Sequence, residues 1–166
     1  YSLSQDDWRR IRAISWMAAF VHFDKIVQIP IILIHELTGI GYRDIFERFM
    51  EVDRGRYPLL GEIRDFFIEE ARSIQKGGAE YVYSDKWLKV YWPADEYIFI
   101  KLTAEGRFDD FYRETSSLLV DLVQSRESTY SLPLAVYAFT KETREVNGQN
   151  ARIFPRLQFG GTHVKD

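Results

Sequence analysis

The chain has 166 residues, of which 46% are hydrophobic and 16% aromatic, and its formal net charge is −3. This size and apolar content predict one folded domain with a sizeable core and argue against intrinsic disorder. The slightly acidic balance gives no overall attraction for nucleic acid or anionic lipid, so we expect neither nucleic acid nor a membrane as a partner. The absence of cysteine excludes disulfides, thiolate metal sites and a cysteine nucleophile.

The start of the chain carries no recognisable signal peptide, which predicts a cytoplasmic protein. The first residue is Tyr1 rather than a methionine, and no internal repeat or linker divides the sequence. We therefore expect residues 1–166 to be a single helical domain that was excised from a larger protein.

The first predicted helix begins at Ser4, where Asp7 three residues later gives a pair similar to a capping box. The pair Phe23-Asp24 interrupts the helical pattern, so the first helix is expected to end there. Apolar residues recur at helical spacing between these two points, at Trp8, Ile11, Ile14, Met17, Ala18 and Val21.

Residues 24–38 form the most apolar stretch, and we predict that they form the central helix of the bundle. A helix that is apolar on nearly every side is normally buried among its neighbours. Its uncharged core is much shorter than the roughly 20 residues that a membrane span needs. Asp24 is expected to cap this helix and Thr38-Gly39 to end it. Pro30 lies either inside the helix, where it would kink the axis, or in the first turn of a helix that starts late.

Prolines at first turns and glycines after last turns delimit the other predicted helices. These helices cover residues 42–50, 58–76, 93–105, 108–122 and 131–147. Residues 81–92 have the least helical pattern, and an extended segment, a short hairpin or an aromatic loop all fit them. Residues 151–166 are expected to form an extended tail. The predicted fold class is therefore all-α, a bundle of about seven helices with a small extended or hairpin insert.

Catalytic motifs are absent from the sequence. His35-Glu36 begins like a zinc-protease helix, but position 39 is glycine where that motif needs a second histidine. Nucleophile-elbow and phosphate-loop patterns are also missing. We therefore assign no catalytic, cofactor-binding or metal-binding residue. His22 and Asp24 are instead candidates for a polar pocket shared with His35 and Glu36, although buried, hydrogen-bonded core groups are the simpler explanation of these residues.

The aromatic segment 81–92 is the second candidate site. Tyrosine and tryptophan bury a large area while keeping a polar tip, and both are enriched at protein interfaces. Trp87, Tyr91 and Trp92 are therefore candidates for a docking surface. The alternative is an aromatic segment that packs on its own bundle.

Two stretches, residues 11–50 and 87–114, resemble the helical region that follows the catalytic barrel in cobalamin-binding radical S-adenosylmethionine proteins. Residues 92–96 (WPADE) match a turn of that family that leads into an amphipathic helix. Residues 37–47 (LTGIGYRDIFE) match the family pattern L-x-G-x-x-Y-R-x-x-F-E.

The resemblance implies a non-catalytic C-terminal accessory domain that packs on the barrel of its parent protein and shapes part of the substrate cavity. It implies that the parent, and not this segment, carries a 4Fe-4S cluster, S-adenosylmethionine and cobalamin. The three-cysteine motif that holds the cluster is missing here, so no catalytic or cofactor residue carries over. The partners implied are other domains of the same chain.

Two alternatives to the accessory domain follow from the residues. The first is a free-standing helical adaptor that binds a protein or peptide. The second is a stand-alone small-molecule enzyme or binder that uses the region of His22 and His35.

Overall fold

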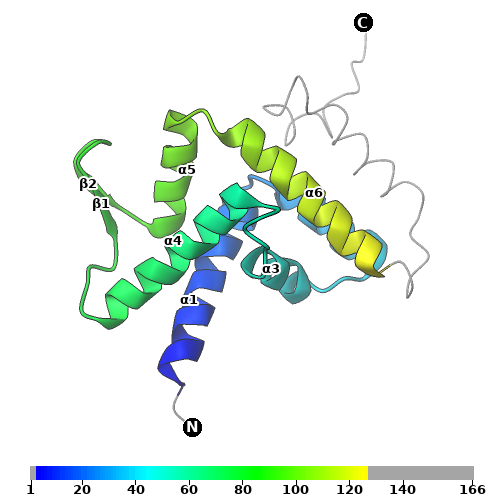
Figure 1. Ribbon diagram of the computed structural model, residues 1–166, viewed down its shortest axis with the longest axis horizontal. Coiled ribbons are helices and arrows are strands. Elements are labelled where there is room, and N and C mark those ends of the chain that lie inside the picture. The colour runs from blue at the N-terminus through cyan, green and yellow to red at the C-terminus, as the bar shows by residue number, and fades with distance from the viewer. Residues whose placement is uncertain (1–2, 127–166) are drawn as a thin grey trace, which may run out of the picture.

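The computed structural model describes residues 3–126, and this part of the chain is helical, as predicted (Figure 1). It contains six α-helices, one short π-helix and a two-stranded hairpin. The predicted seventh helix and the predicted extended tail lie outside the described residues. The elements are α1 (Gln5–Ala18), η1 (Ala19–Phe23), α2 (Gln28–Thr38), α3 (Tyr42–Met50), α4 (Pro58–Gln75), β1 (Val82–Ser84), β2 (Val90–Trp92), α5 (Ala94–Ala104) and α6 (Phe108–Arg126).

Helix α1 begins as predicted, because the hydroxyl of Ser4 accepts a hydrogen bond from the backbone N–H of Asp7 at 3.0 Å. Its last turn continues directly into the π-helix η1. There the N–H of Asp24 donates a hydrogen bond of 2.8 Å to the carbonyl of Ala19, five residues earlier, as is typical of a π-helix. The chain then turns, and α2 leaves at 96° to the line of α1 and η1. The predicted end of the first helix at Phe23 is confirmed.

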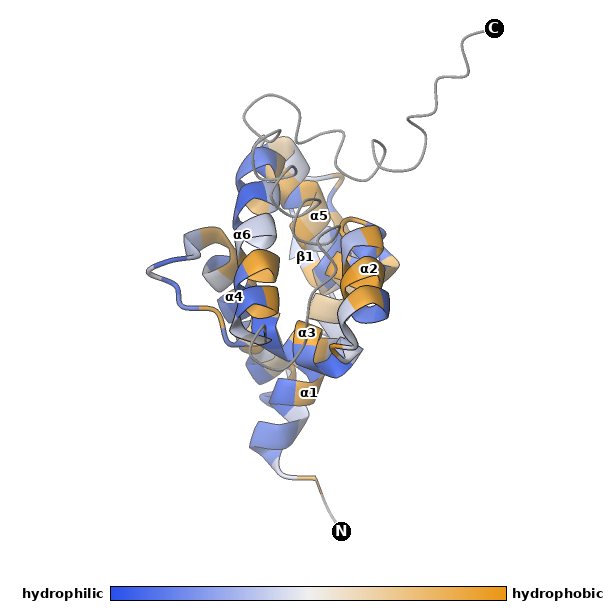
Figure 2. Ribbon diagram, turned by 90° about the vertical axis from the view of Figure 1, so that its right-hand side faces the viewer, coloured by the Kyte–Doolittle hydropathy of each residue, from blue (hydrophilic) through white to orange (hydrophobic). Residues whose placement is uncertain are grey.

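The prediction that residues 24–38 form one central helix is wrong. Helix α2 begins only at Gln28, and Asp24 ends η1 instead of capping α2. Pro30 consequently lies in the first turn, where it removes no helical hydrogen bond. The C-terminal half of α1 packs against α3, α4 and α5, and its N-terminal end projects from the bundle (Figure 1). Helix α2 lies at one side of the molecule (Figure 2).

None of the described helices alone is both long and apolar enough to span a membrane. Gln5–Phe23 and Gln28–Thr38, which are bent at 96° to each other, have the required length and apolar composition only when they are taken together.

Glycines and prolines end and begin the helices where the sequence predicts. Gly39, Gly77 and Gly106 follow α2, α4 and α5 with φ angles of 72°, 89° and 65°, a conformation that other residues rarely adopt. Pro58 is the first residue of α4, and Pro93 directly precedes α5. The boundaries of the later helices are therefore local properties of the sequence.

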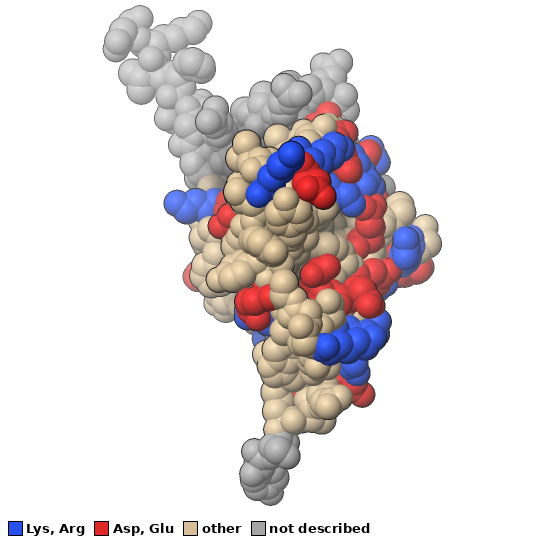
Figure 3. Space-filling view, turned by 90° about the vertical axis from the view of Figure 1, so that its left-hand side faces the viewer, with Lys and Arg blue, Asp and Glu red and all other residues tan. Residues whose placement is uncertain are grey.

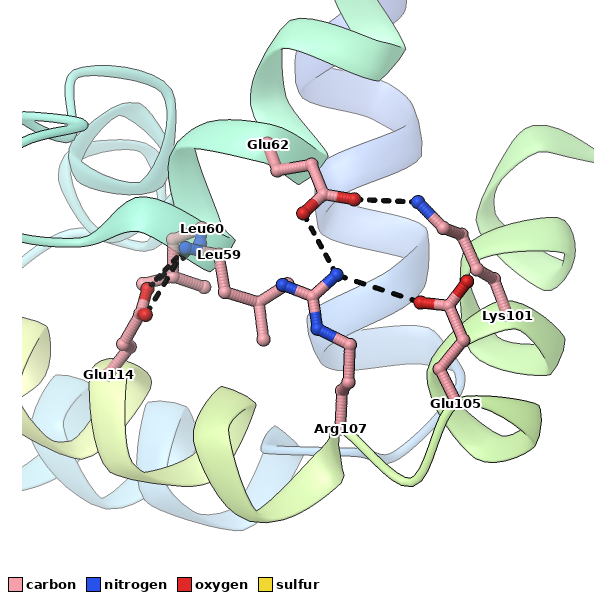
Figure 4. A network of polar contacts seen from close by, with 7 residues as sticks. All are labelled: Leu59, Leu60, Glu62, Lys101, Glu105, Arg107 and Glu114. Atoms are coloured by element: carbon pink, nitrogen blue, oxygen red, sulfur yellow. Dashed lines mark hydrogen bonds and ion pairs between the residues drawn. The ribbon is translucent and has the colours of Figure 1, made fainter.

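The N-terminus of α4 is capped by a side chain from another helix. Its own N-cap residue, Tyr57, makes no side-chain cap. The carboxylate of Glu114 on α6 instead accepts hydrogen bonds from the N–H groups of Leu59 and Leu60 at 3.0–3.1 Å (Figure 4). Glu114 is only 8% exposed, so these bonds form away from water and join α6 to α4.

A second contact joins the same two helices at the preceding turn. The hydroxyl of Tyr57 donates a hydrogen bond to Asp121 of α6, and Arg56 forms an ion pair with the same carboxylate at 2.5 Å. Burial, followed by the hydrogen bond to Asp121, raises the pKa of Tyr57 to about 12. Tyr57 therefore remains a neutral hydrogen-bond donor across the physiological range.

Helix α5 is attached to α4 by a polar network on the other side. Glu62 of α4 accepts hydrogen bonds from Lys101 at 2.6 Å and from Arg107 at 2.9 Å, and Arg107 also pairs with Glu105 at 3.6 Å (Figure 4). Burial opposes ionisation of Glu62, but the bonds from the two cations keep the pKa of this carboxyl below its usual value.

Replacing Glu114 by alanine is expected to lower the free energy of unfolding by about 2–3 kcal/mol, because two buried N–H groups of α4 lose their acceptor. Glu114→Gln keeps one acceptor oxygen and should lose less. Exposed Glu36→Ala is the control and should change stability by under ~0.5 kcal/mol. Urea unfolding monitored by circular dichroism measures all three. A loss for Glu114→Ala as small as that of the control would contradict the capping role.

Candidate functional site

The two predicted histidines both contact Tyr42 of α3. The ring of His35 lies 4.2 Å from the Tyr42 ring, and the ring of His22 lies 5.7 Å from it. His35 also places its Nδ1 2.9 Å from the carbonyl oxygen of Ile40, and His22 packs edge-on against Phe46 at 6.0 Å. The structure therefore brings the two histidines together, but their neighbours are the aromatic rings of Tyr42 and Phe46.

The surroundings of His22 in this cluster disfavour the charged form of its ring. Burial lowers its pKa, and its buried Nδ1 has no hydrogen-bond partner among the described residues. The π-helix explains its position, since the wider turn of η1 shifts the residues that follow α1. Asp24 and Glu36 lie exposed on the surface. The four residues therefore do not form the shared polar pocket that we expected, because η1 and α2 direct the carboxylates to solvent.

Asp24 instead lies near the acidic first turn of α5. Loss of hydration, followed by the negative charges of Asp95 and Glu96, raises the pKa of Asp24 to about 6. The sequence alone does not indicate this proximity, because Asp24 and Asp95 are separated by most of the described chain. At neutral pH three carboxylates repel one another at this point of the surface.

The segment 81–92 forms an antiparallel hairpin in which Val82 pairs with Trp92, Tyr83 with Tyr91, and Ser84 with Val90. Alternation along the strands places Tyr83 and Tyr91 on the same outer face, with their rings 5.1 Å apart. Tyr83 is 46% exposed and Tyr91 62% exposed. The hairpin therefore presents a pair of tyrosines to solvent.

Trp87 attaches the hairpin to the bundle. Trp87 packs on Tyr97 of α5 with ring centres 5.1 Å apart, and its backbone N–H donates to the hydroxyl of Ser84 at 3.1 Å. The indole N–H of Trp92 donates to the carbonyl of Trp87 at 3.4 Å. Trp87 and Trp92 are half-buried, and Trp92 pairs with Val82 on the face opposite to Tyr91, so of the three predicted docking residues only Tyr91 belongs to the outer face.

The tip of the hairpin adds to the exposed apolar surface. Leu88 and Lys89 have positive φ angles of 60° and 54°, which turn the chain between the strands, and Leu88 is 80% exposed. Figure 3 views the molecule from the hairpin side and shows uncharged surface flanked by acidic and basic groups. Sequence reasoning placed Tyr83 in the aromatic segment, but only the register of the strands shows that it pairs with Tyr91.

A groove between α1 and α3, of about 640 Å³, is a further candidate site that sequence reasoning missed. Charged side chains at its rim come from both helices, and Arg10 of α1 approaches Glu47 of α3 to 3.8 Å. The groove is lined by Leu3, Asp7, Arg10, Ile11, Ile14, Tyr42, Arg43, Phe46 and Glu47. Ile11 and Ile14 are part of the predicted stripe of the first helix, and the pattern alone does not show that α3 leaves a space beside them.

Within residues 3–126 the side chains of histidine, aspartate and glutamate form no group of three or more that is placed to hold a metal ion. Comparisons of the chain with protein-family models, with curated proteins and with solved structures find no match. The function is therefore inferred from the surfaces described above and from the resemblance noted in the sequence.

Replacing Asp24 by asparagine is expected to raise the stability of the fold at neutral pH and to change that stability little in acid. The folded state binds the Asp24 proton more tightly than the unfolded chain, because the pKa in the folded state is raised to about 6. The free energy of unfolding therefore falls as the pH rises from about 4 to about 7, and Asp24→Asn removes that fall. Since the side chain is solvent-exposed, screening limits the expected gain at neutral pH to about 0.5–1 kcal/mol.

Urea unfolding of the wild type and of Asp24→Asn at about pH 4 and pH 7 measures this difference. An equal gain at both pH values would show that ionisation of Asp24 is not its cause.

Proposed function

We propose that the chain is a non-catalytic accessory domain that docks onto a larger protein through the outer face of its hairpin. The observation that carries the proposal is the exposed tyrosine pair on an anchored hairpin. We name this surface the hairpin face, and it consists of Tyr81, Tyr83, Leu88 and Tyr91, all more than 40% exposed.

The chemistry of the hairpin face suits protein recognition. Tyrosine supplies a large, rigid contact area at a small cost in side-chain entropy, and its hydroxyl can still form hydrogen bonds. Several large apolar side chains gathered on one projecting element mark an interaction site more strongly than scattered ones do. An interface of this kind usually derives most of its binding energy from a few such aromatic residues.

The anchoring of the hairpin supports the same proposal. Trp87 on Tyr97 fixes the hairpin to α5, and α5 is itself joined to α4 by the contacts of Glu62. A binding element that is already ordered loses little conformational freedom on docking, so more of the contact energy appears as affinity.

The resemblance to radical S-adenosylmethionine proteins specifies the partner in this proposal. The partner is the catalytic barrel of the same parent chain, which carries the 4Fe-4S cluster, S-adenosylmethionine and cobalamin, and the domain forms part of the wall of its substrate cavity. The domain itself performs no chemistry.

A free-standing adaptor is the second candidate function, and the groove between α1 and α3 favours it. Its apolar floor includes Ile11, Ile14 and Phe46, with Arg10 and Glu47 at the rim. An apolar floor between charged rims is the usual receptor for an amphipathic helix. In this case the partner is a helical peptide of another protein.

The first experiment determines the native reading frame around this segment and tests docking to the product of its upstream part. We expect an upstream region that includes a CxxxCxxC motif and that binds this domain when the two are produced as separate polypeptides. The double variant Tyr83→Ser/Tyr91→Ser should weaken this binding by about 10- to 100-fold, since it removes two exposed aromatic contacts.

Ile11→Ser/Ile14→Ser in the groove is the matched control and should bind normally if it remains folded. Trp92→Ala should weaken both docking and the thermal stability of the domain, because the indole of Trp92 donates to the carbonyl of Trp87, the residue that packs on α5. Unchanged binding of a folded Tyr83→Ser/Tyr91→Ser variant would contradict the hairpin face, and a reading frame without the cysteine motif would contradict the proposed parent protein.

A further inference from the structure

The first turns of α1 carry apolar side chains that the described residues leave uncovered. Leu3, which lies directly before the N-cap residue, is 56% exposed, and Ile11 is 55% exposed. The N-terminal end of α1 projects from the bundle, so these side chains stand where another molecule can reach them (Figure 1). Each exposed aliphatic side chain forgoes the gain from burial, and several on one element mark an interaction surface.

These residues belong to one stripe along the groove between α1 and α3. Asp7, Arg10 and Ile14 are spaced as i, i+3 and i+7, which share one side of a helix with 3.6 residues per turn. Leu3 and Ile11 line the same groove of about 640 Å³ as these three residues. We name the five residues the α1 stripe. It faces the groove and not the core.

The order of residues along the α1 stripe is self-complementary. From its N-terminal end the stripe reads apolar, acidic, basic and apolar, at Leu3, Asp7, Arg10 and Ile14. When two such helices lie antiparallel, Leu3 of one copy faces Ile14 of the other. Asp7 then faces Arg10 of the other copy, and the two-fold symmetry of such a pair forms each contact twice. A parallel pair would instead place like charges opposite each other, which is unfavourable.

The two charged side chains of the stripe are available for these contacts. Arg10 is exposed, and its ion pairs with Glu47 at 3.8 Å and Glu51 at 3.6 Å are long and contribute little. Asp7 is also exposed, and its carboxylate accepts one hydrogen bond from the hydroxyl of Ser4 at 2.6 Å. A carboxylate has about four acceptor positions, so Asp7 can bind a guanidinium as well.

We infer that two copies of the chain associate through their α1 stripes, with the two α1 helices antiparallel and each lying along the groove of the other copy. Leu3 and Ile11 are then covered, and Tyr42 and Phe46 of α3 supply the apolar wall of the groove. The contact extends over only about three helical turns, so we expect a weak dimer with a dissociation constant of about 10–100 μM.

This inference does not depend on the hairpin face. It assigns the groove to a second copy of the chain and not to a helix of another protein.

Sedimentation equilibrium of the full chain, over concentrations that bracket this dissociation constant, tests the inference. Asp7→Arg and Arg10→Asp each turn both attractive contacts into repulsive ones, so each should raise the dissociation constant by at least about 10-fold. Circular dichroism checks that the variants are folded. Leu3→Ser changes a residue outside the helix, so it leaves α1 intact, and it should weaken the dimer by at least about 3-fold because it removes two apolar contacts.

Mixing the two charge variants gives the sharper readout. The Asp7→Arg chain carries two cations on its stripe and the Arg10→Asp chain two anions, so a pair made of one of each restores attraction at both contacts. We expect a 1:1 heterodimer at concentrations where each variant alone is monomeric. The matched control mixes Glu36→Arg with Lys89→Asp, which make the same charge changes on exposed side chains of α2 and the hairpin. Each control variant should dimerise like the wild type, and mixing them should add nothing.

A wild-type chain that stays monomeric over the whole range would overturn the inference and leave the groove to a helix of another protein. A dimer that tolerates both charge variants, or a charge-variant mixture that associates no more than the control mixture, would overturn it as well, since the contact would then lie elsewhere on the chain.

Discussion

The buried carboxylate of Glu114 is the contact on which the arrangement of α4 and α6 depends. The loop before α4 supplies no cap of its own, because the carboxylate of Asp53 accepts from the N–H of Gly55 at 2.9 Å instead. The free N–H groups of Leu59 and Leu60 therefore need an acceptor from elsewhere in the fold. Glu114 supplies it from α6 and fixes the position of that helix along α4. Since α4 packs along α1, the same contact places α6 on the central pair of helices.

A continuous series of contacts leads from this core to the candidate docking surface. Glu62 on the next turn of α4 binds Lys101, which lies in the last turn of α5, and Arg107, which follows that helix. Helix α5 in turn carries Tyr97, on which Trp87 of the hairpin packs. The exposed tyrosine pair thus stands on an element that the core holds in place. An interaction domain needs this combination of a rigid support and an unpaired aromatic surface.

The turn between η1 and α2 decides what the histidines do. The π-helix carries His22 towards Tyr42, and α2 returns at 96° so that His35 reaches the same ring. The carboxylates of Asp24 and Glu36 are left in solvent, so neither of them joins the aromatic cluster in which the histidines lie. Such a cluster is suited to packing α1, α2 and α3 together, and it gives no support for a catalytic role.

The sequence by itself determined the local structure of this protein. The cap at Ser4, the first turn at Pro58 and the glycine after α5 at position 106 follow from residues that are neighbours in the chain, and the structure confirms each of them. Only the tertiary structure decided what depends on distant residues: the cap that Glu114 provides for α4, the pairing of Tyr83 with Tyr91, and the acidic neighbours of Asp24. The apolar pattern of residues 24–38 showed that both sides of a helix prefer burial, but it did not say against which neighbours. Hydrophobic burial has no direction of its own, so the choice of neighbours is made by the fold as a whole.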